Sequence, residues 1–151
     1  MTIEQRPLFS LQAKVSTPQI TPDGPYGERR FIPVTGGKFS GERMSGIMLA
    51  GGADSQLVRT DGVVEMDVRC SLRTDDDVIV FMKTFGFRHG PAEVFARMAK
   101  GEKVDRGEYY FRELVSFEAP KGKYEWLNRL IAIGVGERLP ELVILDVFEI
   151  L

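Results

Sequence analysis

Two glycine doublets organise this sequence, one in Val34-Thr35-Gly36-Gly37-Lys38-Phe39-Ser40-Gly41 and the other in Leu49-Ala50-Gly51-Gly52-Ala53-Asp54-Ser55-Gln56. Each doublet falls at the predicted end of a strand, where a Cβ atom would be in the way. Glycine permits positive φ and lets a second backbone or a ligand approach closely. The doublets therefore predict tight strand ends, and Gly36 and Gly37 are candidate ligand contacts.

Short strands extend in both directions from the doublets. Residues 8–15 alternate between apolar and polar side chains, which is typical of a half-buried strand. Similar runs cover residues 29–34, 43–49, 57–60, 63–72, 78–87, 109–118, 130–135 and 142–151. About nine or ten short strands predict an all-β fold, and consecutive antiparallel hairpins close most simply into an up-and-down barrel.

Only one segment predicts a helix. Pro91 suits a first helical position, Glu93 lies in the first turn and Gly101 follows Lys100 at the end. Residues 17–27 hold three prolines and predict a loop. No linker or repeat divides the chain, so we expect a single barrel domain over residues 1–151.

Composition excludes several classes of protein. Lys plus Arg is 20 and Asp plus Glu is 22, a net charge of −2 that does not suit a nucleic-acid partner. One cysteine, no signal peptide and no long apolar run lead us to expect a cytoplasmic protein without a membrane partner. Phosphate-loop and dinucleotide motifs are absent, so we expect no cofactor. We also expect no metal, although the acids at 75–77 leave a calcium or magnesium site open.

The segment Leu57–Leu72 contains the clearest hairpin signal. Asp61-Gly62 lies between two runs of β-forming residues and favours a two-residue type I′ turn. Such a turn would place Asp54 opposite Arg69. Because side chains alternate along a strand, it would collect a polar patch on one face. That patch comprises Asp54, Gln56, Glu65, Asp67, Arg69 and Ser71. The opposite face would be apolar.

The sequence leaves open which face lies inside. By the usual rule, the apolar face fills the barrel and the polar patch is solvated. Alternatively, the polar patch lines the lumen and a partner subunit covers apolar outer surface. Residues 78–87 and 142–151 are apolar on both faces, which favours this second arrangement. It predicts a homo-oligomer, most simply a dimer.

The second arrangement also predicts a site. Asp54 and Asp67 in a dry lumen would titrate apart and supply a base and an acid. Arg69 would hold an enolate or carboxylate. These three are the candidate catalytic residues, and the candidate ligand contacts are Gly36, Gly37, Gln56, Glu65, Arg112, Trp126 and Asn128.

Five motifs, in order and spacing, resemble the domain of unknown function 3237 family, also called uncharacterised protein family 0311. The motifs are Phe31–Gly41, Gly51–Asp54, Leu72–Asp76, Tyr110–Arg112 and Tyr124–Arg129. The resemblance implies a small antiparallel β-barrel with an internal cavity, often oligomeric, and no general activity. Two positions depart from the family pattern. Ser55 replaces a usual tryptophan, which we expect to widen the cavity, and Asp77 replaces a usual glycine in a turn.

Three functions are consistent with these observations. The first is a cofactor-independent isomerase or lyase that moves protons on, or cyclises, a small organic substrate. The second is a non-catalytic ligand-binding barrel, a carrier or a sensor. The third is a structural oligomer whose polar patch is ordinary surface.

Overall fold

The computed structural model describes residues 1–151. It contains ten strands, one α-helix and two short 3-10 turns. The strands are β1 (Gln5–Val15), β2 (Gln19–Gly24), β3 (Gly27–Ser40), β4 (Ser45–Met48), β5 (Ala53–Val58), β6 (Val64–Thr74), β7 (Ile79–His89), β8 (Tyr110–Glu118), β9 (Ala132–Arg138) and β10 (Leu142–Ile150). The helix is α1 (Ala92–Ala99), and the 3-10 turns are η1 (Arg106–Glu108) and η2 (Glu125–Arg129).

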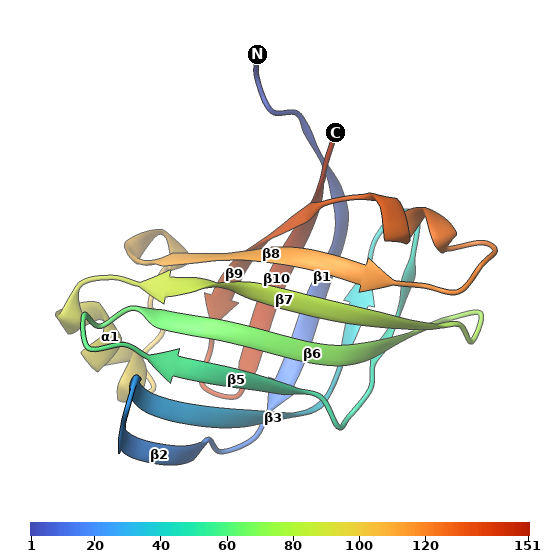
Figure 1. The fold of residues 1–151 in the computed structure, drawn as a ribbon. Helices are drawn as coiled ribbons and strands as arrows, with labels where there is room; N and C mark the ends of the chain where they lie inside the picture. Colours follow the sequence, from blue (N-terminus) through green and yellow to red (C-terminus); the bar gives the residue numbers. More distant parts are fainter.

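The sheet closes on itself into an antiparallel barrel (Figure 1). β1 pairs with β10 on one side and with β3 on the other. β4 and β5 follow one another between β3 and β6 and share one position in the wall, while β2 pairs only with β3. The wall therefore has eight strand positions. The predicted all-β barrel with one short helix is confirmed.

The two ends of the barrel are built differently. α1 lies at the end where β7 finishes and β8 begins, and η2 lies at the opposite end (Figure 1). Pro91 immediately precedes the first residue of α1, so the predicted helix is confirmed. None of the helices has the length and apolar character of a membrane span.

The predicted loop at residues 17–27 is wrong in part, because β2 forms a strand there. β2 pairs with residues 29–31 of β3 and shifts register between Thr21 and Gly24. Pro22 falls inside that irregular region. Proline is tolerated in such an exposed strand because an unpaired edge does not need its missing N–H group.

The first glycine doublet lies within β3 and does not end the strand. A Cβ atom on Gly37 would lie 2.3 Å from the carbonyl oxygen of Gln12, and Gly36 has a φ of +148°. The doublet thus allows β3 to approach β1 closely, which is a role in packing. The second doublet separates β4 from β5, as predicted for a strand end, and Gly51 there has a φ of +107°.

The barrel is filled mainly by apolar side chains. Leu11, Leu72, Val80 and Val115, from four different strands, are each at most 2% exposed. The outer face of β7 and β8 also carries exposed apolar side chains among polar ones, and Phe81 there is 55% exposed. The homodimer that the sequence predicts would cover a face of this kind, and it stays a prediction.

The predicted register of the β5–β6 hairpin is wrong by one residue. Asp54 lies opposite Val68, and Val58 lies opposite Val64. The loop has three residues, because the N–H of Arg59 donates to the carbonyl of Val63. Asp-Gly suits this loop as well as a two-residue one, with glycine taking the left-handed position. Gly62 has a φ of +86°.

The one-residue shift divides the predicted polar patch between the two faces, with two of its six residues inside and four, including Ser71, outside. Asp54 and Gln56 point into the barrel beside Met66 and Val68. Glu65, Asp67 and Arg69 instead lie on the outer face, because they alternate with inward residues of β6. The sequence left open an apolar interior or a lumen lined by the polar patch. The structure lies between these two arrangements, because the lumen is apolar with a few polar groups.

Candidate active site

A cavity of about 60 Å³ lies inside the barrel. Twelve of its 18 lining residues are hydrophobic. The polar lining residues are Asp54, Gln56, Thr84, Arg88, Glu113 and Arg138. They come from four strands far apart in the sequence, so only closure of the barrel brings them together.

β8 positions Glu113. This strand turns Phe111, Glu113 and Val115 inward, and Glu113 is only 5% exposed. The residues paired with it are Gly86 of β7 and Gly134 of β9. No side chain therefore stands directly beside Glu113 on either neighbouring strand, and the Leu145 side chain packs over Gly134 instead.

β5 positions Asp54. Its Oδ2 accepts a hydrogen bond from Gln56 Nε2 at 2.7 Å, and its Oδ1 accepts one from the backbone N–H of Asp67 at 3.1 Å. Asp67 thus donates to a side chain at a point where the β5–β6 pairing is interrupted. Burial raises the pKa of Asp54, against these two hydrogen bonds and the nearby Arg88 charge, which lower it.

Burial, together with the smaller effect of the nearby charge of Asp54, raises the pKa of Glu113 to about 8. A hydrogen bond from the Thr84 side chain and the charge of Arg88 lower the pKa of Glu113, but they do not outweigh burial. At neutral pH, Glu113 therefore holds its proton. The two carboxyl groups of the lumen differ in environment, which is the arrangement that separates an acid from a base.

Two arginines lie at the end of the lumen nearest α1. Arg88 ends the inward row of β7 and is 9% exposed, and Arg138 ends β9. Neither side chain forms an ion pair within 4 Å, and Arg88 Nε has no hydrogen-bond partner. Burial lowers the pKa of Arg88 to about 10, which still leaves it charged at neutral pH.

A vestibule of about 460 Å³ lies outside the lumen at the same end. Phe95 and Met98 of α1 form part of its wall, together with Arg30 of β3. The vestibule and the inner cavity share four lining residues, which are Ile32, Gln56, Arg88 and Arg138. The two spaces are therefore adjacent, with the arginines at the neck between them.

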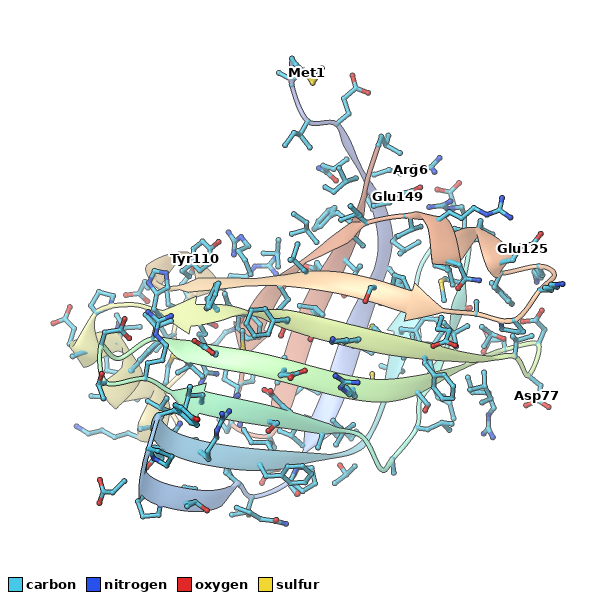
Figure 2. The ribbon with its side chains drawn as sticks, in the orientation of Figure 1. Met1, Arg6, Asp77, Tyr110, Glu125 and Glu149 are labelled. Carbon is cyan, nitrogen blue, oxygen red and sulfur yellow. The ribbon has the colours of Figure 1, made fainter.

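The remaining predicted site residues lie away from this cavity. Arg112 is exposed on the outer face, where it donates to the carbonyl of Phe111 and lies over the ring of Tyr110. Figure 2 labels Tyr110 at the end that carries α1. Gly36 and Gly37 pack β3 against β1. Glu65, Asp67 and Arg69 lie on the outer face, as described above.

Trp126 and Asn128 lie at the opposite end, in η2, where Figure 2 labels Glu125 and Asp77. Asn128 bonds both the N–H and the carbonyl of Ala119. Ser55 is exposed and opposite Phe31, outside the lumen, so the expectation that it widens the cavity is wrong. Asp77 has a φ of +65° in the β6–β7 turn, which explains a glycine preference there.

Sequence reasoning missed Thr84, Arg88, Glu113 and Arg138. One signal was readable, because Glu113 interrupts an apolar alternation between Phe111 and Val115. No three His, Cys, Asp or Glu side chains come together as a metal-binding group.

The sequence profile described as "Protein of unknown function (DUF3237)" matches residues 3–150. This chain belongs to that family. The UPF0311 protein of Rhodopseudomonas palustris is 33% identical over 150 residues, covering 99% of this chain and 98% of the relative. The UPF0311 protein of Clostridium acetobutylicum is 38% identical over 144 residues, covering 95% of this chain and 91% of the relative.

Several solved structures have the same barrel. A conserved protein of unknown function from R. palustris matches with a TM-score of 0.96 and 32% identity, covering 100% of this chain and 99% of that one. A β-barrel-like protein from Acinetobacter baumannii matches with a TM-score of 0.87 and 36% identity, covering 100% and 98%. An enzyme from Penicillium herquei shares the fold, with a TM-score of 0.77 and 20% identity, covering 100% and 96%.

Proposed function

We propose that the lumen binds a small organic molecule and catalyses proton transfer on it without a cofactor, as an isomerase or lyase, including ring closure. The observation that supports this most strongly is the pair of carboxyl groups, Asp54 and Glu113, in one small cavity without an ion-pair partner. In this proposal the acid–base pair is Asp54 and Glu113, whereas the sequence predicted Asp54 and Asp67.

Asp54 is the base and Glu113 is the acid. The hydrogen bonds from Gln56 and the Asp67 N–H favour the ionised form of Asp54. Glu113 holds a proton at neutral pH, as its pKa of about 8 requires. A carboxylate and a carboxylic acid facing one ligand are the groups that general acid–base catalysis needs.

The proposed step balances without an oxidant or reductant. Asp54 removes a proton from a carbon or hydroxyl of the substrate, and the electron pair moves into the substrate's unsaturated system. Glu113 then delivers its proton to another atom of that system. In ring closure, the deprotonated hydroxyl adds to the acceptor carbon while Glu113 protonates the neighbouring atom. Return of the proton from Asp54 to Glu113 through water resets the enzyme.

Unpartnered polar atoms in the lumen support ligand binding. Gln56 Oε1 and Arg88 Nε are buried without a hydrogen-bond partner. Buried polar groups in proteins are nearly always bonded, so two orphans in one cavity are available to orient a ligand. The shared fold of the P. herquei enzyme supports only the compatibility of this barrel with catalysis.

The alternative is a carrier or sensor that binds the same ligand without turnover. The mainly apolar lining favours this function, because twelve hydrophobic residues could hold a ligand without chemistry. The two functions differ in whether the bound ligand exchanges protons. One experiment can measure both binding and proton exchange.

The experiment follows 2-tetralone and 2-cyclohexenone by proton NMR in D₂O with the purified protein. Line broadening reports binding, and loss of the α-proton signals reports proton abstraction. We expect exchange above the buffer rate with the wild-type protein. Asp54→Asn and Glu113→Gln should bind but not exchange, whereas Glu118→Gln, at an exposed position of β8, should behave as wild type. Binding without exchange would favour the carrier, and equal exchange in all variants would contradict the assigned roles.

A further inference from the structure

The interior of the barrel carries more positive than negative charge. Arg88 and Arg138 both line the cavity, whereas Asp54 is the one carboxyl group there that can offset them at neutral pH, since burial raises the pKa of Glu113 to about 8. Burying a charge without a counter-charge is costly. A surplus cation in a buried cavity therefore indicates an anionic partner that the protein itself does not supply.

Many surface arginines have a carboxylate partner, and the others are solvated. Arg6 and Arg43 share Glu149, and Arg97 pairs with Glu108, whereas Arg69 and Arg112 have no ion pair but are exposed to water. Arg30, at the rim of the vestibule, pairs with Glu28 at 2.7 Å.

Arg88 and Arg138 form no ion pair and no side-chain hydrogen bond to the protein, although each guanidinium has five N–H donors. Arg88 is more than nine-tenths buried, and its nearest aromatic neighbour is Phe95, whose ring centroid lies 5.8 Å from the guanidinium carbon. Its Nε is thus buried without an acceptor.

We propose that the natural ligand is a small organic carboxylate, whose carboxylate group binds between Arg88 and Arg138 at the neck of the barrel. Planar guanidinium groups match carboxylates with two parallel hydrogen bonds, which gives geometric specificity as well as affinity. This inference rests on the proposed function only in placing the ligand in the lumen.

The ligand would extend through the neck, with one part in the inner cavity and the other in the vestibule. The inner cavity of about 60 Å³ holds only a small group, which would face Asp54 and Glu113. The vestibule of about 460 Å³ is within the usual size range of a ligand site, and Phe95, Met98 and Val58 give it apolar walls. An acid with an apolar or aromatic body therefore fits, with its reacting end inward.

The test compares phenylacetate with phenylacetamide, which has nearly the same shape and no charge, by isothermal titration at pH 7. We expect phenylacetate to bind the wild-type protein at least about tenfold more tightly, because hydrogen bonds to charged groups are the stronger ones. Equal affinity, or no binding of phenylacetate at millimolar concentration, would overturn the inference. This comparison needs no variant.

Variants then locate the contact. Arg88→Gln and Arg138→Gln should lose the preference for phenylacetate, while Arg112→Gln, on the outer face, should keep it. Arg88→Lys keeps the charge and should retain part of the preference if the first variant fails to fold, as checked by circular dichroism. Full preference in folded Arg88→Gln and Arg138→Gln would overturn the assignment.

Glu113→Gln separates this inference from the proposed catalysis. Its preference for phenylacetate should persist, while proton exchange on the ketone probes should be lost. If the preference holds but the wild-type protein exchanges no protons, catalysis fails and the inference stands. If exchange occurs without any carboxylate preference, the inference fails and catalysis stands.

Discussion

At the η2 end of the barrel, the two predicted ligand contacts, Trp126 and Asn128, interact with other protein groups. Asn128 bonds both backbone groups of Ala119, at 2.7 and 2.8 Å. Arg43 lies over the ring of Trp126, 4.2 Å from its centroid, and also pairs with Glu149. Asn128 and Trp126 were predicted as ligand contacts, and here each has a protein partner.

At the α1 end, similar residue types lack such partners. Arg88 and Arg138 have no carboxylate within 4 Å, and Gln56 Oε1 accepts no hydrogen bond. A buried polar group without a partner costs free energy. The difference teaches that residue type alone does not mark a site, whereas unmet hydrogen-bonding capacity in a cavity does.

The largest expected effect is on catalysis at the α1 end. Asp54→Asn removes the proposed base and should lower the rate of proton exchange by about 10²- to 10⁴-fold, because general base catalysis contributes that much. The NMR exchange rate of bound 2-tetralone measures it. Asn128→Ala at the η2 end is the matched comparison and should leave the rate within about twofold of wild type. Similar losses in both variants would remove the functional distinction between the ends.

The second effect is on stability against pH. Glu113 has a pKa of about 8 in the folded protein and 4.5 as its ordinary value, so the folded state holds a proton that the unfolded state loses. Its contribution is full below pH 4.5 and is lost as the pH rises to 8, with a slope of up to about 1.4 kcal/mol per pH unit. The raised pKa of Asp54 acts in the same direction.

Urea unfolding of wild type and Glu113→Gln from pH 4 to 9 measures this slope. The variant should lose less stability over this range, because its amide does not titrate. Parallel curves for the two proteins would show that Glu113 ionises normally in the folded state.

The third effect is a gain of stability at the α1 end. Arg88→Met removes a buried charge that has no ion-pair partner and should raise the free energy of unfolding by about 1–4 kcal/mol. Arg97→Met, at an exposed ion pair with Glu108, should change it by less than about 1 kcal/mol. Thermal and urea unfolding measure both. A marked loss of stability in Arg88→Met would mean that the fold depends on this arginine.

The smallest expected effect is a loss of stability at the η2 end. Asn128→Ala removes two hydrogen bonds to Ala119 and should lower the free energy of unfolding by about 1–2 kcal/mol. Asn128→Asp keeps the acceptor and should lose less. An unchanged stability in Asn128→Ala would show that these exposed bonds are replaced by water.

Much of the fold could be predicted from the sequence, because alternation and turn residues are local signals. Closure into a barrel and the helix after Pro91 followed from them. The register of the hairpin around Asp61-Gly62 did not, since this dipeptide suits loops of two or three residues. That single residue decides which side chains face inward.

The site was less predictable than the fold. Asp54 and Gln56 were found, and Glu113 was readable as a charge within an apolar alternation. Arg138 could not be recognised, because the inward positions before it on β9 are Gly134 and Gly136, which give no apolar alternation. Arg88 ends a strand and resembled the start of a turn. Whether a polar side chain has a partner depends on neighbours far apart in the chain.

The most direct test of the account is the pKa of Glu113, followed by the ¹³C chemical shift of its side-chain carboxyl carbon between pH 4 and 10. The account predicts a midpoint of about 8. It also predicts that the midpoint falls in Asp54→Asn, because the nearby charge of Asp54 helps to raise it. A midpoint near 4.5 in the wild-type protein would contradict the proposal that the lumen holds a protonated acid beside an ionised base.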